Sequence, residues 1–90
     1  MFYTYVIKND VGNIYIGYTS DLENRLKRHN GLMTTKKKSY THRHKAGKWT
    51  LVLTEKFSSR VEAIRREREL KSYQGRKYIR QVIEEQNMGR

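Results

Sequence analysis

Two aromatic and β-branched segments open the chain with only a short turn between them, and this arrangement constrains the fold most. Residues 2–8 read FYTYVIK and residues 14–18 read IYIGY, and both compositions are typical of β-strands. Residues 9–13, NDVGN, carry turn-forming side chains. The first 18 residues are therefore predicted to form a β-hairpin in which Lys8 pairs with Ile14.

A helix is predicted directly after the hairpin. Ser20 and Glu23 have the spacing of a capping box, in which a serine at the start of a helix is followed three residues later by a glutamate. Leu22 and Leu26 would form the apolar face of this helix. Asn30-Gly31 favours its end, because glycine and asparagine commonly terminate helices.

Alternation between apolar and polar residues predicts a third strand. Residues 49–57 read WTLVLTEKF, which has the period of two that a strand requires. The odd-numbered Trp49, Leu51 and Leu53 would share one face of this strand, and Val52 would lie on the other face.

Two further helices complete the chain. Ser59 and Glu62 form a second capping box, which predicts a helix that ends or bends near Tyr73–Gly75. Apolar residues at positions 78, 79, 82 and 83 predict another helix to about Glu85, with residues 86–90 frayed. The order β-β-α-β-α-α predicts an α/β fold of the α+β kind, a three-stranded antiparallel sheet flanked by helices, in a single domain spanning residues 1–90.

The charge of the chain favours a polyanionic partner. There are 20 Lys and Arg residues against 9 Asp and Glu residues, a net charge of +11. Such a field attracts nucleic acid more readily than membrane here, because no helix pattern combines a broad apolar face with a basic one. Charge-only binding to RNA or ribosomes is the alternative. The chain has no cysteine, no signal-peptide pattern and no long apolar run, so we expect a cytoplasmic location.

Residues 31–48 form a long segment without clear periodicity, and we expect it to be a loop that contacts DNA phosphates. Tyr40 could stack on an unpaired base. The alternative is a disordered loop, which could also become ordered on DNA. His42-Arg43-His44 is a weak metal motif, since neither cysteine nor a nearby acid accompanies it. The basic residues of the segment are Lys36, Lys37, Lys38, Arg43, Lys45 and Lys48.

One acid lies where a helix should be apolar. On the helix that follows Ser59, Glu67 falls within the stripe formed by Ala63, Ile64 and Leu70. A carboxylate on a buried face is costly unless it meets a cation. Two interpretations remain open at this point, a metal site and a salt bridge to one of the many arginines.

Other polar residues are predicted to approach one another. The hairpin register places Tyr5, Tyr15 and Gly17 on one face of the sheet, where the glycine leaves room for a neighbouring group. Arg25 and His29 are four residues apart, so they stack on one side of their helix. Each feature also has an ordinary structural explanation, namely packing tyrosines, a solvated helix face and a strand irregularity.

As a set, these residues resemble the GIY-YIG nuclease superfamily over nearly the whole chain. The matching positions are Tyr5-Val6-Ile7, Tyr15-Ile16-Gly17, Arg25, His29 and Glu67. The first triad departs from Gly-Ile-Tyr, and we assign its tyrosine role to Tyr5 by spacing and register. The chain looks most like the small stand-alone bacterial proteins of this superfamily.

This resemblance implies a metal-dependent DNA endonuclease that acts in repair or recombination, on DNA that could be branched or single-stranded. It implies one divalent cation, Mg²⁺ or Mn²⁺, at Glu67, and a phosphate contact from Arg25. Tyr5 or Tyr15 would assist the attacking water, and His29 would orient a tyrosine or phosphate or shuttle a proton. Gly17 would let the backbone pack closely at the site. The alternative is a non-catalytic nucleic-acid-binding module with the same fold. The oligomeric state stays open.

Overall fold

The computed structural model describes residues 1–30 and 49–88, so the predicted DNA-contacting segment lies outside the described residues. The described elements follow the predicted order β-β-α-β-α-α. None of these helices is long and apolar enough to cross a membrane. The elements are β1 (Phe2–Lys8), β2 (Ile14–Thr19), α1 (Leu22–His29), β3 (Thr50–Phe57), α3 (Arg60–Lys71) and α4 (Tyr73–Met88).

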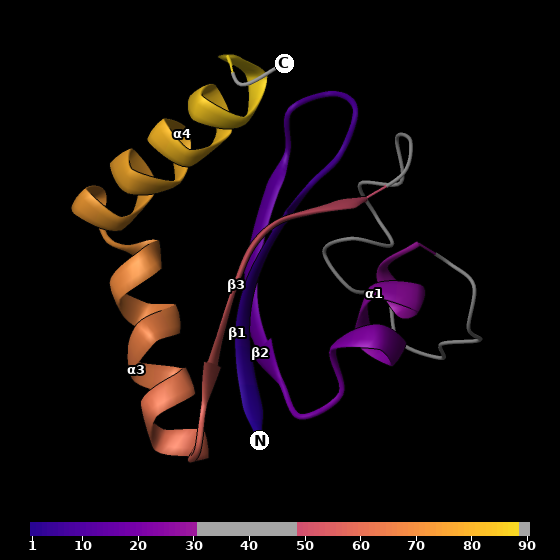
Figure 1. Ribbon diagram of the computed structural model, residues 1–90, viewed down its shortest axis with the longest axis vertical. Helices are drawn as coiled ribbons and strands as arrows, with labels where there is room; N and C mark the ends of the chain where they lie inside the picture. Colours follow the sequence, from indigo (N-terminus) through magenta and orange to yellow (C-terminus); the bar gives the residue numbers. More distant parts are fainter. Residues whose placement is uncertain (31–48, 89–90) are drawn as a thin grey trace.

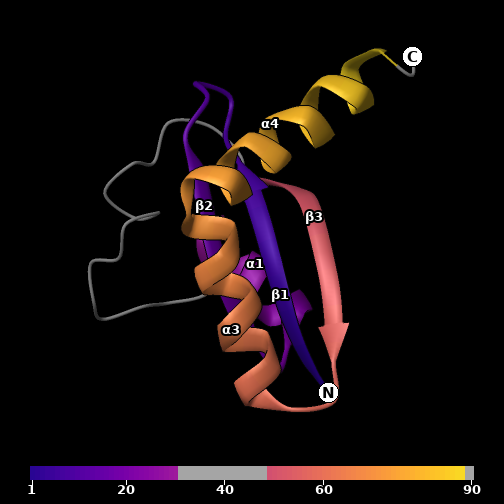
Figure 2. The same ribbon diagram turned by 90° about the vertical axis from the view of Figure 1, so that its left-hand side faces the viewer.

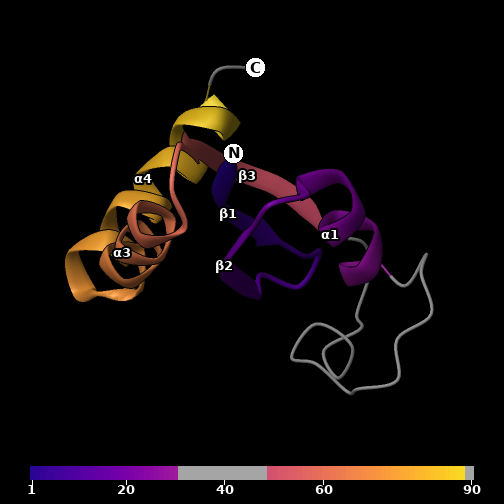
Figure 3. The ribbon, with the colours of Figure 1, turned by 90° about the horizontal axis from the view of Figure 1, so that it is seen from below.

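The three strands form one antiparallel sheet in the order β2-β1-β3. Lys8 pairs with Ile14 as predicted, which places Tyr5 opposite Gly17. Helix α1 covers one face of the sheet, and α3 and α4 cover the other (Figures 1 and 3). The predicted α+β architecture is therefore confirmed, and β2 forms one open edge of the sheet.

The hairpin turn is held by an asparagine side chain. Asn9 Oδ1 accepts hydrogen bonds from the backbone N–H groups of Val11 and Asn13, at 3.2 and 2.8 Å. Gly12 adopts a φ of +91°, a conformation that residues with a Cβ rarely take. These contacts fix the turn, and the turn in turn fixes the strand register that aligns the tyrosines.

Each face of the sheet has its own apolar core. On the α3 and α4 side, the core residues are Val6, Ile16, Val52, Leu70 and Ile79. On the α1 side, Tyr5, Ile7 and Trp49 are buried beneath the leucines of the short helix. The sheet is consequently covered on both faces although the chain is small.

One predicted strand face is wrong because β3 contains a β-bulge. Val6 pairs with Leu53 while the next residue, Ile7, pairs with Leu51, so Val52 is the extra residue. The bulge breaks the alternation, and Leu53 packs with Val52 in the α3 and α4 core instead of sharing a face with Leu51. The alternation of apolar residues within β3 cannot reveal that its pairing with β1 leaves one residue of β3 without a partner.

The predicted cap of α1 is also shifted by one residue. Asp21, and not Ser20, is the N-cap, and its carboxylate accepts hydrogen bonds from the backbone N–H and the side chain of Asn24. An aspartate can fill this position as well as a serine can. By contrast, Ser59 caps α3 as predicted, since its hydroxyl accepts from the N–H of Glu62.

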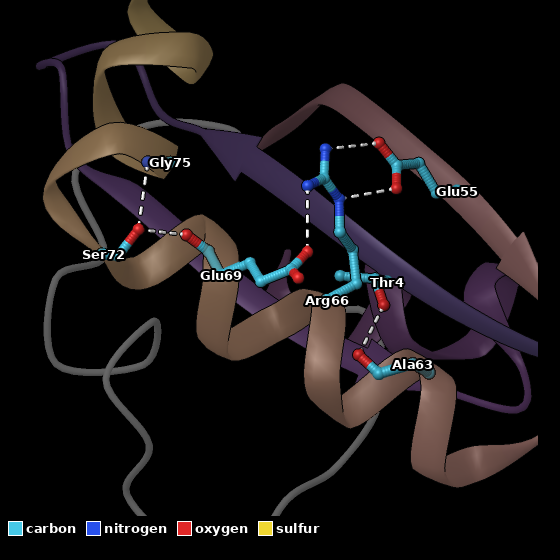
Figure 4. Close-up of polar contacts among 7 residues, drawn as sticks. All are labelled: Thr4, Glu55, Ala63, Arg66, Glu69, Ser72 and Gly75. Carbon is cyan, nitrogen blue, oxygen red and sulfur yellow. Dashed lines mark hydrogen bonds and ion pairs between the residues drawn. The ribbon is translucent and has the colours of Figure 1, made fainter.

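Helices α3 and α4 meet at a serine. The hydroxyl of Ser72 donates to the carbonyl of Glu69 and accepts from the N–H of Gly75 at 3.1 Å (Figure 4). A Cβ at Gly75 would lie only 2.1 Å from the Glu69 carbonyl oxygen, so the glycine permits close approach of the two helices. The predicted break is confirmed, but the glycine lies inside α4 and does not terminate α3.

The C-terminal helix is longer than predicted. Helix α4 continues to Met88, beyond the predicted end near Glu85. The side-chain amide of Gln86 donates to the carbonyl of Val52 at 2.8 Å. This hydrogen bond attaches the last turns of α4 to the bulged position of β3.

Polar contacts fix α3 against the sheet (Figure 4). The buried hydroxyl of Thr4 donates to the Ala63 carbonyl at 2.7 Å. Arg66 donates two hydrogen bonds to the carboxylate of Glu55 on β3 and one to Glu69. The hydrogen bond with Glu55 is the main reason that the pKa of Arg66 is raised. Helix α3 is thus bonded to both β1 and β3, which sets its rotation about its own axis.

Candidate active site

A cavity of about 350 Å³ opens at the β2 edge of the sheet. Helix α1 flanks this edge on one face and α3 flanks it on the other (Figures 1 and 2). Four of the predicted site residues border the cavity, namely Tyr15, Gly17, Arg25 and Glu67. The remaining lining residues are Phe2, Tyr18, Thr19, Ser20 and Arg60.

Behind the cavity, Tyr5 and His29 form a buried pair. Tyr5 Oη lies 2.8 Å from Nε2 of His29, and the exposed fractions of the two residues are 1% and 8%. Burial, with a smaller effect from Arg25, lowers the pKa of His29 to about 4, so the ring is neutral near pH 7. Burial is also the main cause that raises the pKa of Tyr5, with Tyr15 adding to it. The direction of this hydrogen bond depends on the tautomer of the neutral histidine, since Nε2 can accept from the Tyr5 hydroxyl or carry the proton and donate to it.

Three rings pack together around this pair. The ring centroids of Tyr5 and Tyr15 are 6.2 Å apart, and those of Tyr15 and His29 are 4.7 Å apart. Such tilted contacts are favourable for aromatic rings. The rings of Tyr5 and His29 thus pack against Tyr15, whose side chain also borders the cavity.

Gly17 makes room for both tyrosines. A Cβ at this position would lie 2.9 Å from Tyr5 Oη and 3.0 Å from the ring of Tyr15. Both distances are below ordinary van der Waals contact. A residue without a Cβ therefore allows the two tyrosines to pack close to the β2 backbone.

Glu67 extends from α3 toward the same cavity. Its side chain is 17% exposed, while its neighbours Ala63 and Leu70 in the apolar stripe are fully buried. Lys71 Nζ lies 3.4 Å from Glu67 Oε2, so the ion-pair partner among the described residues is a lysine one turn later and not an arginine. Arg66, one residue away, pairs with Glu55 and Glu69 instead.

The donor set around Glu67 fits a hard divalent cation. Mg²⁺ in such sites takes one or two carboxylates, keeps several waters and accepts phosphate oxygens. Within residues 1–30 and 49–88, no group of three or more His, Asp or Glu side chains could form a metal site from protein ligands alone. A single carboxylate bordering an open cavity matches the first arrangement. The side chain of Lys71 is 50% exposed, so it can move away from Glu67 when a cation arrives.

Arg25 faces Glu67 from the other side of the sheet edge. It lies one turn before His29 on α1 and is half-buried. In the part of the chain that the structure describes, it has no ion-pair partner. Its guanidinium is thus available to an anionic ligand in the cavity.

Arg60 also borders the cavity, and the sequence did not single it out. Its guanidinium lies 5.6 Å from the centre of the Phe2 ring, a cation–π distance. The available signal was its position seven residues before Glu67, which places both on the same side of α3. That signal was weak because α3 carries several arginines.

Asn30 and Trp49, the described residues on either side of positions 31–48, are joined by two hydrogen bonds. The side chain of Asn30 donates to the Trp49 carbonyl at 3.1 Å and accepts from the Trp49 N–H at 2.6 Å. The rings of Trp49 and His29 are 6.5 Å apart between centroids. The Asn30–Trp49 pair therefore lies next to the buried histidine.

Comparison with known proteins gives the same family. The family model described as "GIY-YIG catalytic domain" matches residues 1–79. A UPF0213 protein of Staphylococcus aureus (strain Mu3 / ATCC 700698) is 32% identical over 85 residues, with 91% of this chain and 94% of the relative covered. A UPF0213 protein of Staphylococcus saprophyticus is 33% identical over 82 residues with the same coverage.

A solved structure is also similar. The solution NMR structure of a UPF0213 protein from Bacillus halodurans shares 29% sequence identity, with a TM-score of 0.52. The match covers 91% of this chain and 85% of that chain. The relatives are therefore small bacterial proteins of similar extent. The chain belongs to the GIY-YIG family, a nuclease superfamily.

Proposed function

We propose that the protein is a metal-dependent DNA endonuclease that hydrolyses phosphodiester bonds at the β2-edge cavity. The observation that carries this proposal is that a carboxylate, a guanidinium and a tyrosine from three separate elements border one cavity in a GIY-YIG domain. Repair or recombination, with branched or single-stranded DNA, is the cellular context that we propose.

In this proposal Glu67 holds one divalent cation, Mg²⁺ or Mn²⁺. When bound, such a cation neutralises charge on the scissile phosphate and on the departing oxygen. Glu67 offers a partly exposed carboxylate, which is paired with Lys71 until the cation binds.

Arg25 contacts the scissile phosphate. The planar guanidinium can donate two parallel hydrogen bonds to phosphate oxygens as negative charge develops on them. Its position across the cavity from Glu67 lets the two residues approach the phosphate from opposite sides.

Tyr15 positions the attacking water. Tyr15 reaches the cavity, whereas the Tyr5 hydroxyl is buried and bonded to His29. We therefore assign the water to Tyr15, and we assign Tyr5 and His29 the role of holding Tyr15 in place. Gly17 keeps the space in which the two tyrosine rings pack.

The segment 31–48 is the proposed DNA-contacting arm. Its six basic side chains and Tyr40 would track phosphates and stack on a base, as expected from the sequence. The Asn30–Trp49 pair supports this proposal, because it joins the residues on either side of the segment, and Trp49 packs near His29.

A non-catalytic DNA-binding module is the second candidate. The ion pair between Lys71 and Glu67 favours it, because a lysine occupies the carboxylate that a cation needs. The test must therefore separate binding from cleavage.

The experiment measures cleavage of labelled duplex, single-stranded, flap and four-way-junction DNA in Mg²⁺, in Mn²⁺ and in EDTA. Wild type, Glu67→Ala and the control Glu85→Ala are compared, and Glu85 is an exposed acid on α4. DNA binding in EDTA is measured for all three by fluorescence anisotropy. Competition between RNA and DNA separates a DNA-binding protein from an RNA-binding one.

We expect wild type and Glu85→Ala to cut only with metal, and Glu67→Ala to bind DNA without cutting. If wild type binds all substrates but cuts none of them under any condition, the binding module replaces the nuclease. If Glu67→Ala cuts as well as wild type, Glu67 does not hold the cation.

A further inference from the structure

The charged side chains of α3 and α4 are divided between the two sides of the helical layer. On the β3 side, Arg66 is neutralised by Glu55 and Glu69. On the β2 side, Arg60 borders the cavity already described. The carboxylate of that cavity, Glu67, is already paired with Lys71. The β2 side therefore has an excess of cations.

A second cavity lies at the other end of β2. It measures about 190 Å³ and is lined by Ile14, Arg76, Ile79 and Arg80. Ile14 is the first residue of β2, whereas the larger cavity is bordered by residues from Tyr15 to Thr19, the last residue of the strand. The two cavities thus follow one another along one strand (Figure 2 shows α3 running beside this strand and α4 continuing from α3).

Both arginines of the second cavity suit an anionic ligand. Arg76 Nε donates to the carbonyl of Lys71 at 3.1 Å, which orients its guanidinium while leaving other N–H groups free to donate. Arg80 lies one turn later on the same side of α4. Neither arginine has an ion-pair partner within the described residues, and both are exposed.

The spacing of the two cavities suits a nucleic-acid backbone. From Ile14 to Thr19 the strand rises about 17 Å, at roughly 3.3 Å per residue. One strand of duplex DNA carries a phosphate about every 3.4 Å along the helix axis. A single DNA strand can therefore reach both cavities within about five nucleotides.

We propose that the cleaved DNA strand lies along the outer edge of β2, with Arg60 binding a phosphate at one end and Arg76 and Arg80 binding phosphates at the other. The scissile phosphate lies near the Arg60 end, where Glu67 and Arg25 border the same cavity. This inference rests on the proposed function for the identity of the ligand. It adds a DNA contact made by Arg76 and Arg80, which have no role in the proposed reaction.

The test measures DNA affinity in EDTA as a function of salt. The variants are Arg76→Gln/Arg80→Gln, Arg60→Gln and the control Lys56→Gln/Arg65→Gln. Like the α4 variant, the control removes two positive charges. They lie at exposed positions on β3 and on the outer side of α3. Thermal unfolding of each variant checks that the fold is retained.

We expect the salt dependence, the slope of log Kobs against log salt, to fall by roughly 1–2 for the α4 variant and by roughly 1 for Arg60→Gln, since each phosphate contact contributes about 0.9. The control should retain the wild-type slope. Equal loss in the control and the α4 variant would show that only net charge matters, and an unchanged slope in both arginine variants would also overturn the path.

The same assay separates this path from the nuclease proposal. Because it is performed without metal, the slopes report on the path even if no substrate is ever cut. Conversely, metal-dependent cleavage together with unchanged slopes would retain the nuclease and reject the path.

Discussion

Acid should destabilise the protein through His29. The buried ring stays neutral until the pH approaches about 4, whereas the same histidine in the unfolded chain binds a proton below about 6.5. Between these two values the unfolded state holds more protons than the folded state, so stability falls as the pH falls.

The size of this effect follows from the two pKa values. Between pH 8 and pH 5, linkage gives a loss of about 2 kcal/mol of unfolding free energy from His29 alone. The full loss, reached below pH 4, is about 3 kcal/mol. For a domain of this size either value is a large part of the total stability.

Urea unfolding at several pH values measures the effect, and the buried Trp49, the one tryptophan of the chain, gives the fluorescence signal. The variant His29→Gln keeps a neutral side chain that can donate to the Tyr5 hydroxyl or accept from it but cannot be protonated, so its stability should change little between pH 8 and pH 5. The control His42→Gln/His44→Gln should retain the wild-type dependence. The same pH dependence in wild type and His29→Gln would refute a buried neutral ring.

Three other substitutions have definite expected outcomes. Gly17→Ala should lower the unfolding free energy by about 1–3 kcal/mol in urea titrations, because the added methyl overlaps two tyrosine rings; a stability equal to wild type would contradict that packing. Arg66→Lys should lower the unfolding free energy by about 1 kcal/mol, since lysine cannot form the two parallel hydrogen bonds to Glu55. A double-mutant cycle with Glu55→Gln should assign most of this loss to the interaction between the two residues. Lys71→Met should tighten Mn²⁺ binding to the DNA-free protein about twofold, as measured by the EPR signal of free Mn²⁺, because it removes the cation paired with Glu67; weaker binding would show that the lysine helps to place the carboxylate.

Local patterns predicted the hairpin and its consequences well. A strand has a period of two, so one correct pairing, Lys8 with Ile14, was enough to place Tyr5 and Tyr15 on a common face and Gly17 beneath them. The capping box at Ser59 likewise depends on residues only three positions apart.

Contacts between distant parts of the chain were less predictable. The bulge at Val52 depends on how β3 meets β1, and the partner of Glu67 could not be chosen by composition when 20 cations were available. The hydrogen bond between Tyr5 and His29 joins residues 24 apart and exists only once α1 packs on the sheet. The same is true of Arg60, whose relevance appears only beside the cavity.

The Asn30–Trp49 pair has a consequence for how this domain can vary. Its two hydrogen bonds resemble those between paired backbone residues of two strands. They join Asn30 at the end of α1 to Trp49, the residue before β3. The entropic cost of such a closed loop grows slowly, by about 0.6 kcal/mol for each doubling of its length. Segments of different length and charge can therefore be exchanged between Asn30 and Trp49 while the sheet, the buried histidine and the cavity are left unchanged.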